Sequence, residues 1–239
     1  MDKPSEIIGE FFKVLLGAAS LTAGIISAGG LVAFNPFRHC KPEPPRTSQE
    51  VHRKAFQGDV DGFWRALVMG PHLDVPNPAG LTPLHEAALA GKTSMVQAIL
   101  RLNPRVNARD DLQRTPLHLR TLFGHASVSE LLLKEGADLH ARDISGRTPL
   151  LTAVIYGRTA VVPTLLARGS RVDEQDQWGW TSLHWAVYVG DRRLVRQLLA
   201  TGARRDLKGY RKRTPADIAR AKKYREIQAL LESRTTPAR

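Results

Sequence analysis

The ten residues TPLHEAALAG at 82–91 return as TPLHLRTLFG at 115–124, 33 positions further along the chain. A threonine side chain can accept a free amide at the start of a helix, and proline in the first helical position costs no backbone hydrogen bond. A glycine can end a helix in the left-handed conformation. The stretch therefore predicts a short helix that begins after the threonine and ends at the glycine.

The same register runs through most of the chain. Its glycines are Gly58, Gly91, Gly124, Gly157 and Gly190. A second apolar pattern recurs at Met95, Val128, Val161, Leu194 and Ile227, and again at Ile99, Leu132, Leu165, Leu198 and Leu231. Each repeat thus predicts two helices whose shared apolar face can be buried only against the neighbouring repeats, and the expected fold class is an all-α repeat.

Three motifs carry a family resemblance: TPLHEAALAG at 82–91, NARDDLQRTPLH at 107–118 and KEGADLHARDISGRTPL at 134–150 resemble ankyrin repeats. The resemblance implies an ankyrin solenoid of about six helix-turn-helix units with connecting β-hairpin-like loops, over residues 49–233. The expected units are 49–81, 82–114, 115–147, 148–180, 181–213 and 214–233. The first unit lacks the Thr-Pro pair and the last is polar, as suits two caps.

Several residues depart from the family pattern. Leu151 stands where a histidine is usual, and Arg120 and Thr121 replace small alanines. Pro163 falls inside the second helix of its unit, where proline removes a backbone hydrogen bond unless it lies in the first turn. We expect that helix to start late or to bend.

The chain begins with a segment of a different kind. Residues 14–34 contain no charged side chain and predict one hydrophobic helix that spans a membrane, since 21 residues at helical rise cover roughly 30 Å. A leader at 1–13 precedes it, a proline-rich linker at 35–48 follows it, and residues 234–239 form a tail. A cleaved signal peptide is the alternative, although Glu6 and Glu10 make the leader acidic.

The expected membrane helix carries two further signals. Ser20, Gly24 and Ala28 recur at intervals of four, so another helix could approach this stripe closely. Basic residues follow the helix at Arg38, Lys41 and Arg46 and precede it only at Lys3 and Lys13. The positive-inside bias therefore favours a single-pass protein whose repeat domain lies in the cytoplasm. A periplasmic or secreted domain is the alternative that goes with signal cleavage.

The resemblance also implies where a partner binds, namely on a concave face formed by the loop tips and the first helices. Superimposing the repeats gathers aromatic and arginine side chains on this face, a composition typical of binding hot spots. The predicted partner-binding residues are Phe123, Tyr156, Trp178, Trp180, Tyr188, Tyr210, Arg114, Arg147, Arg211 and Arg213.

Residues 178–185 contain three tryptophans, for which the sequence predicts different roles. Trp178 stands at a loop tip, where there is little core to enter, and is predicted to contact the partner. Trp180 is predicted to do the same, although at its register an indole could instead brace the neighbouring loop. Trp185 shares a register with Leu119 and is predicted to pack between repeats.

The sequence offers no catalytic or metal-binding pattern. Its histidines His52, His85, His118 and His184 occupy one repeated register, which indicates backbone hydrogen bonding within the scaffold rather than metal ligation. No nucleophile motif, cysteine pair or cofactor motif is present, so no enzyme, cofactor or metal is expected.

The charge distribution points to the kind of partner. The net charge is +12, and residues 181–239 hold 15 of the lysines and arginines against 5 acidic residues. The sequence therefore predicts a non-enzymatic, membrane-tethered module that binds a protein partner, most simply an acidic one.

Two alternatives stay open. The architecture is similar to bacterial envelope immunity proteins that neutralise a cognate secreted toxin such as a lipase. The basic stretches GYRKR at 209–213 and ARAKKYR at 219–225 could instead bind anionic lipid or nucleic acid. Nucleic acid is the weaker of these two ligands, because no element designed to enter a groove is visible.

Overall fold

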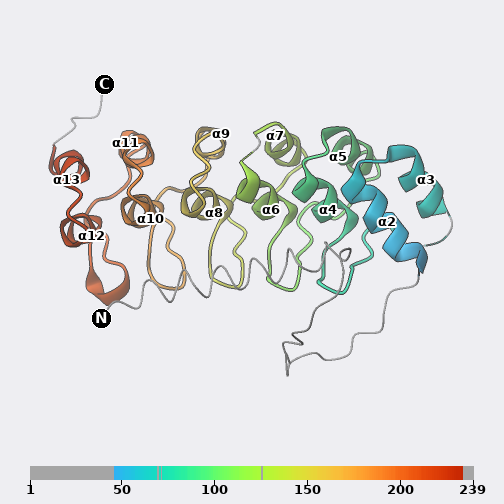
Figure 1. Ribbon diagram of the computed structural model, residues 1–239, viewed down its shortest axis with the longest axis horizontal. Coiled ribbons are helices and arrows are strands. Elements are labelled where there is room, and N and C mark those ends of the chain that lie inside the picture. Colours follow the sequence, from blue (N-terminus) through green and yellow to red (C-terminus); the bar gives the residue numbers. More distant parts are fainter. Residues whose placement is uncertain (1–45, 69, 71, 125, 234–239) are drawn as a thin grey trace, which may run out of the picture. The chain divides into compact units, whose positions relative to one another are not determined.

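A computed structural model describes residues 46–233 except 69, 71 and 125, and all regular secondary structure in this part is helical (Figure 1). It belongs to the second of two compact units, which spans Pro44–Arg239. Twelve α-helices lie in the described residues, together with one short 3-10 helix. The expected all-α ankyrin solenoid is confirmed.

The helices form six consecutive pairs. They are α2 (Arg46–Gln57) with α3 (Val60–Val68), α4 (Pro83–Ala90) with α5 (Thr93–Leu100), α6 (Pro116–Phe123) with α7 (Ala126–Lys134), α8 (Pro149–Ile155) with α9 (Val162–Ala167), α10 (Ser182–Val189) with α11 (Arg192–Ala200), and α12 (Pro215–Ala221) with α13 (Arg225–Glu232). Helix η1 (Tyr210–Lys212) lies in the loop before α12.

The first helices of the pairs lie side by side in one row, and the second helices form a parallel row beside them (Figure 1). Each first helix packs against the first helices of the adjacent repeats. Between repeats the chain runs out into a long loop on the far side of the first helices (Figure 1). The loops and the first helices therefore present one continuous face of the repeat array.

The helix starts follow the predicted chemistry. Thr82 precedes α4 in an extended conformation, and Nδ1 of His85 accepts the Thr82 amide at 3.1 Å. The helix ends at Gly91, whose φ of 68° is left-handed. Helix α8 lacks the histidine because Leu151 replaces it, so only the Thr148 hydroxyl accepts an amide there, at 3.3 Å.

The core consists of the apolar stripes that the register predicted. One cluster joins the first repeats through residues such as Met95, Ile99 and Leu132, and a second joins the later repeats around Leu165 and Leu198. Each of these side chains is buried. Burial between repeats is therefore the main stabilising interaction, as expected for units that have no core of their own.

Two departures from the family pattern have visible consequences. Helix α9 spans six residues and begins at Val162, so Pro163 lies in its first turn and the expected late start is confirmed. Arg120 is buried, and its Nη1 donates to the carbonyl of Ala88 at 3.3 Å. A Cβ on Gly91 would lie 2.6 Å from that Nη1, so the glycine leaves room for the larger side chain.

Helix α2 begins at Arg46, inside the stretch that was expected to belong to the linker 35–48. The other N-terminal predictions lie outside the described residues: the membrane helix 14–34 with Ser20, Gly24 and Ala28, and most of the linker. The tail 234–239 lies outside them too. Within the described part, none of the helices has both the length and the apolar character needed to cross a bilayer.

Candidate functional site

The loops between repeats are held by one recurring device. Oδ1 of Asp176 accepts the amides of Trp178 and Trp180, both at 2.9 Å. Oxygens of Asn77, Asp110 and Asp143 accept the amides two and four residues ahead in the same way, at 2.8–3.0 Å. A side-chain oxygen that bonds its own loop in this manner stabilises a tight turn, so the loop tips are pre-organised.

Neighbouring loops are also joined to one another. The amide of Asp111 donates to Ala79 at 3.1 Å, that of Ile144 to Leu112 at 2.9 Å, and that of Gln177 to Ser145 at 3.0 Å. These bonds tie four consecutive loops into one layer. Side chains at the loop tips therefore keep the repeat spacing of the helices behind them.

An aromatic cluster lies where the fourth and fifth repeats meet, at the junction of the loop 176–180 and helix α10. The ring centroids of Trp180 and Trp185 are 4.7 Å apart, and those of Trp180 and Tyr188 are 5.3 Å apart. Trp178 meets Trp185 edge to face at 6.4 Å. Trp185 is buried, and its Nε1 donates to Oδ2 of Asp176 at 2.8 Å, so the prediction that it packs is confirmed.

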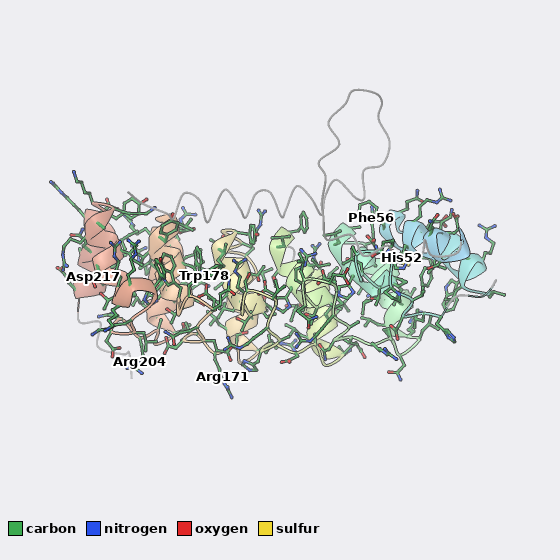
Figure 2. All side chains as sticks on the ribbon, turned by 90° about the horizontal axis from the view of Figure 1, so that it is seen from below. His52, Phe56, Arg171, Trp178, Arg204 and Asp217 are labelled. Atoms are coloured by element: carbon green, nitrogen blue, oxygen red, sulfur yellow. The ribbon has the colours of Figure 1, made fainter. Side chains whose placement is uncertain are left out.

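The carboxyl of Asp176 is the hub of this cluster. Its two oxygens hold the loop amides on one side and the indole of Trp185 on the other. Burial raises the pKa of Asp176, while these hydrogen bonds act in the opposite direction. Figure 2 shows Trp178 between the two ends of the repeat array, nearer to Asp217 than to Phe56.

Two cations lie over the aromatic rings. The guanidinium of Arg147 is 5.2 Å from the ring centroid of Trp178, and the ammonium of Lys222 is 3.7 Å from that of Tyr188. Lys222 was not among the predicted site residues, although it shares the register of Phe123 and Tyr156. That register was the signal in the sequence that could have identified it.

The predicted placement of Arg147 on the exposed face is wrong, because its side chain is only 6% exposed. The charge is desolvated, and this burial lowers the pKa of Arg147. Its guanidinium lies 5.2 Å from the ring centroid of Trp178, and the negative charges of Asp143 and Asp176 partly oppose the lowering of its pKa. Arg147 therefore supports the surface from beneath rather than offering its charge to a partner.

Trp180 is half-buried and reaches toward the next loop. A Cβ on Gly209 would lie 2.5 Å from Cδ1 of the indole, so Gly209 is the residue that lets the ring come this close. The ring also stacks on His184 at a centroid distance of 6.0 Å. These contacts fit the interpretation that the Trp180 indole braces the neighbouring loop. That Trp180 also contacts a partner stays a prediction.

The remaining predicted residues differ in exposure. Phe123 is 46% exposed and Tyr210 is 42% exposed, whereas Tyr156 is partly buried. Arg114 is tied to Asp110 by a bond of 2.8 Å from its Nε. Arg211 and Arg213 are exposed, and the Arg211 guanidinium lies 5.4 Å from the ring centroid of Tyr210.

Apart from Arg114 and Arg147, the predicted residues fall into three groups. Trp178, Trp180 and Tyr188 form one cluster where the fourth and fifth repeats meet. Tyr210, Arg211 and Arg213 share the last loop, and Phe123 and Tyr156 end the first helices of two earlier repeats. These groups come from the loops and first helices of repeats three to six.

The four registered histidines serve the scaffold. Because Nδ1 of His85 accepts the Thr82 amide, its Nε2 carries the proton and donates to the carbonyl of Arg114 in the next loop at 3.1 Å. His118 and His184 reach the next loop in the same way. Burial lowers the pKa of both His52 and His85 to about 4. The predicted backbone role is confirmed, and the described residues contain no group of three side chains able to hold a metal.

The family comparison agrees with this geometry. A family model described as ankyrin repeats (three copies) matches residues 51–143, 102–176, 122–208 and 150–236. The overlapping matches run from 51 to 236 and thus cover most of the 239 residues. The search of curated proteins found no match. The chain belongs to the ankyrin-repeat family.

Proposed function

We propose that this ankyrin-repeat domain is a non-catalytic module that captures one protein partner on the face formed by its loops and first helices. Ankyrin repeats are protein-interaction units, and the family is typically a non-enzymatic scaffold. The proposal goes further by assigning the contact to repeats three to six. The observation that carries it is the aromatic cluster around Trp178, with its flanking cations, on a pre-organised loop layer.

The energetics favour such a surface. Aromatic side chains lose little conformational freedom when they bind, and aromatic and arginine side chains together dominate the binding energy of most interfaces. Here the backbone beneath Trp178 is already held by Asp176, and its indole is already placed against Trp185 and Arg147. Because the loop and the indole are already ordered before binding, less conformational entropy is lost and the affinity is higher.

Charge defines the class of partner. Arg211, Lys212 and Arg213 are exposed, and none of them forms an ion pair within the part of the chain that the structure describes. The face therefore ends in unpaired positive charge beside Tyr210. Acidic protein surfaces complement such a pattern and are steered toward it in solution.

The proposal includes a tether. Residues 14–34 are uncharged over a length that suits a bilayer, and the basic residues around them favour a repeat domain on the cytoplasmic side. Alkaline extraction of membranes tests the tether: the full chain should stay in the membrane pellet and a variant without residues 14–34 should not. A compartment-sensitive reporter fused after Arg239 tests the side, and a signal outside the cytoplasm would contradict this orientation.

Affinity capture with matched variants tests the surface. The double variant Phe123→Ala/Trp178→Ala removes one phenyl and one indole ring from the proposed face. The control Phe56→Ala/Trp64→Ala removes the same two ring types from the first repeat, where they are 41% and 37% exposed. We expect the first variant to lose the partner by at least about tenfold and the control to keep it.

The melting temperature of each variant is measured as well, because a variant that does not fold would fail to bind any partner. The proposal fails if both variants capture the same proteins as the wild type. It also fails if the control loses the partner to the same extent while its melting temperature is unchanged.

A further inference from the structure

The fifth loop between repeats differs from the four before it. At the start of each earlier loop an Asn or Asp side chain accepts the amides two and four residues ahead: Asn77, Asp110, Asp143 and Asp176. At the same register, 33 residues after Asp176, stands Gly209. The fifth loop has therefore lost the side-chain oxygen that the other loops use.

The amides that would have bonded this oxygen remain. The amide of Arg211 has no acceptor in the part of the chain that the structure describes, and that of Arg213 reaches only the carbonyl of Tyr210, at 3.4 Å. In the preceding loop the equivalent amides of Trp178 and Trp180 both lie 2.9 Å from Oδ1 of Asp176. The fifth loop thus keeps the donors of an oxygen site without its acceptor.

The backbone of this loop also carries more strain. Arg211 has φ 56° and Lys212 has φ 57°, so two consecutive residues with side chains are left-handed. The earlier loops place a single residue in this conformation, and it is glycine in three of them: Gly80, Gly146 and Gly179. Such strain persists where the surroundings impose it, and it recurs at ligand-binding segments.

An indole donor points to the same place. Nε1 of Trp180 is buried, has no hydrogen-bond partner among the described residues, and lies 3.0 Å from the position that a Cβ of residue 209 would take. In the preceding repeat the corresponding oxygen site serves an indole, since Nε1 of Trp185 donates to Asp176. Buried N–H groups are nearly always paired in native proteins, so this donor is a second sign that an acceptor belongs here.

Three side chains of the loop are positively charged, which favours a negatively charged hydrogen-bond acceptor. Arg211, Lys212 and Arg213 are exposed and carry no ion pair within the described residues. The two acidic side chains nearby in sequence are engaged elsewhere, Asp206 with Arg204 at 2.7 Å and Asp217 with the Thr214 amide at 2.9 Å. The loop therefore carries three exposed cations and one backbone amide, that of Arg211, that has no acceptor among the described residues.

We propose that loop 209–213 receives a carboxylate from an acidic segment of the protein partner. The partner's oxygen would take the role that Asp176 has in the preceding loop, accepting the Arg211 amide while the guanidinium groups of Arg211 and Arg213 hold its charge. This inference rests on the proposed function, because it names the group by which that partner is held.

The chain does not supply this carboxylate itself for a steric reason. An aspartate at 209 would bring a Cβ to within 2.5 Å of Cδ1 of Trp180. A carboxylate that arrives with a partner has no atom bonded to Cα of residue 209, so it avoids this collision. The loop would thus bind a carboxylate of the partner where the earlier loops use an Asn or Asp side chain of their own.

A peptide titration tests the site without knowledge of the natural partner. The 15N-labelled full chain in detergent micelles is titrated with an octaglutamate peptide, and amide shifts are followed by NMR. We expect the backbone amide of Arg211 and the indole N–H of Trp180 to move downfield and to saturate together. Arg211→Gln/Arg213→Gln should weaken binding about tenfold, because it removes two charge-assisted contacts but keeps the backbone amides.

The matched control is Arg193→Gln/Arg196→Gln on α11, where both side chains are exposed and make no ion pair in the described part of the chain. It removes the same charge from another surface and should change the affinity less than about twofold. An Arg211 amide that does not shift would overturn the proposal. Equal weakening by both variants would do so as well, since binding would then depend on overall charge.

A second ligand separates carboxylate from phosphate. If octathymidylate binds the same loop more tightly than octaglutamate, the loop reads phosphate and the proposal is wrong. The partner capture described above stays independent. If octaglutamate fails to bind while Phe123→Ala/Trp178→Ala still loses the natural partner, only the assignment of this loop falls and the proposed function stands.

Discussion

At the scale of single residues, Glu86 is a buried carboxyl with a single hydrogen-bond partner in the part of the chain that the structure describes. It is buried in α4, where its Oε1 accepts from Nδ2 of Asn77 at 3.0 Å and its Oε2 has no partner in the described residues. Burial raises the pKa of Glu86 to about 7. The folded protein therefore holds a proton that the unfolded chain, with the usual pKa of 4.5, has already released.

This difference predicts a pH-dependent cost of folding. The contribution of Glu86 to stability falls as the pH rises from about 4.5 to about 7 and then stays low, by up to about 3 kcal/mol. Glu86→Gln should match the wild type near pH 5 and be more stable near pH 8, as measured by urea unfolding. The variant-minus-wild-type difference cancels the titration of the buried histidines, and a difference that is constant with pH would contradict the prediction.

The contact between Trp180 and Gly209 gives a second prediction at this scale. Gly209→Ala should destabilise the protein by about 1–3 kcal/mol, because the new Cβ forces the indole away from the loop. In a Trp180→Ala background the same substitution should cost clearly less, because the indole is gone and only the carbonyl oxygen of Gly179, 3.1 Å from the new Cβ, stays close. Equal effects of Gly209→Ala in both backgrounds would show that the indole does not brace this loop.

The sequence predicted the placement of side chains less well than it predicted the helices. The register identified Trp178 and Arg147 as neighbours on one face, but it could not show that the long arginine side chain turns inward under the indole. Lys222 likewise reaches Tyr188 from the last repeat. A repeat register defines backbone positions, whereas the rotamer of a long side chain depends on contacts made between repeats.

At the scale of elements, α9 is the weakest helix of the second row. It has six residues, whereas α7 (Ala126–Lys134) and α11 (Arg192–Ala200) have nine each, because Pro163 prevents an earlier start. Fewer backbone hydrogen bonds and a shorter apolar face make local opening cheaper. The domain should therefore open first between the third and fifth repeats.

Native-state hydrogen exchange measures this difference directly. Amides in the last turn of α9 should exchange at least about tenfold faster than those in the last turns of α7 and α11. Those two helices are the natural controls, since they occupy the same place in adjacent repeats. Uniform protection across the three helices would contradict the prediction.

The helices themselves were almost fully predictable from sequence. The Thr-Pro starts, the left-handed glycines and the apolar stripes each have a local cause, and the late start of α9 followed from Pro163 alone. The start of α2 at Arg46 was missed, because the prolines before it indicated a linker. Helix ends without a capping motif are set by packing against the next element, which a single repeat does not reveal.

At the scale of the whole molecule, the charge is concentrated at one end. Residues 181–239 carry ten of the twelve net positive charges, since 15 basic residues face 5 acidic ones there. An acidic partner should therefore be steered toward this end. The association rate should fall several-fold between low and high salt, while the dissociation rate, set by the aromatic contacts, should change less.

Surface plasmon resonance over a salt series checks this division. The outcome that would contradict it is a steep loss of affinity, by a factor of about a thousand or more, between low and moderate salt. Such a slope is characteristic of phosphate polymers and would favour the nucleic-acid or lipid alternative. Arg211→Gln/Arg213→Gln should lower the association rate, and Arg193→Gln/Arg196→Gln should lower it less.

Site-specific photocrosslinking tests the central claim, that a partner binds the face of loops and first helices, most directly. A benzophenone side chain is placed at the exposed loop positions Ile144 and Tyr210 and, as a control, at Val68, which is 82% exposed at the end of α3. We expect one shared crosslinked protein at Ile144 and Tyr210 and none at Val68. Crosslinks at Val68 alone, or at all three positions alike, would contradict it.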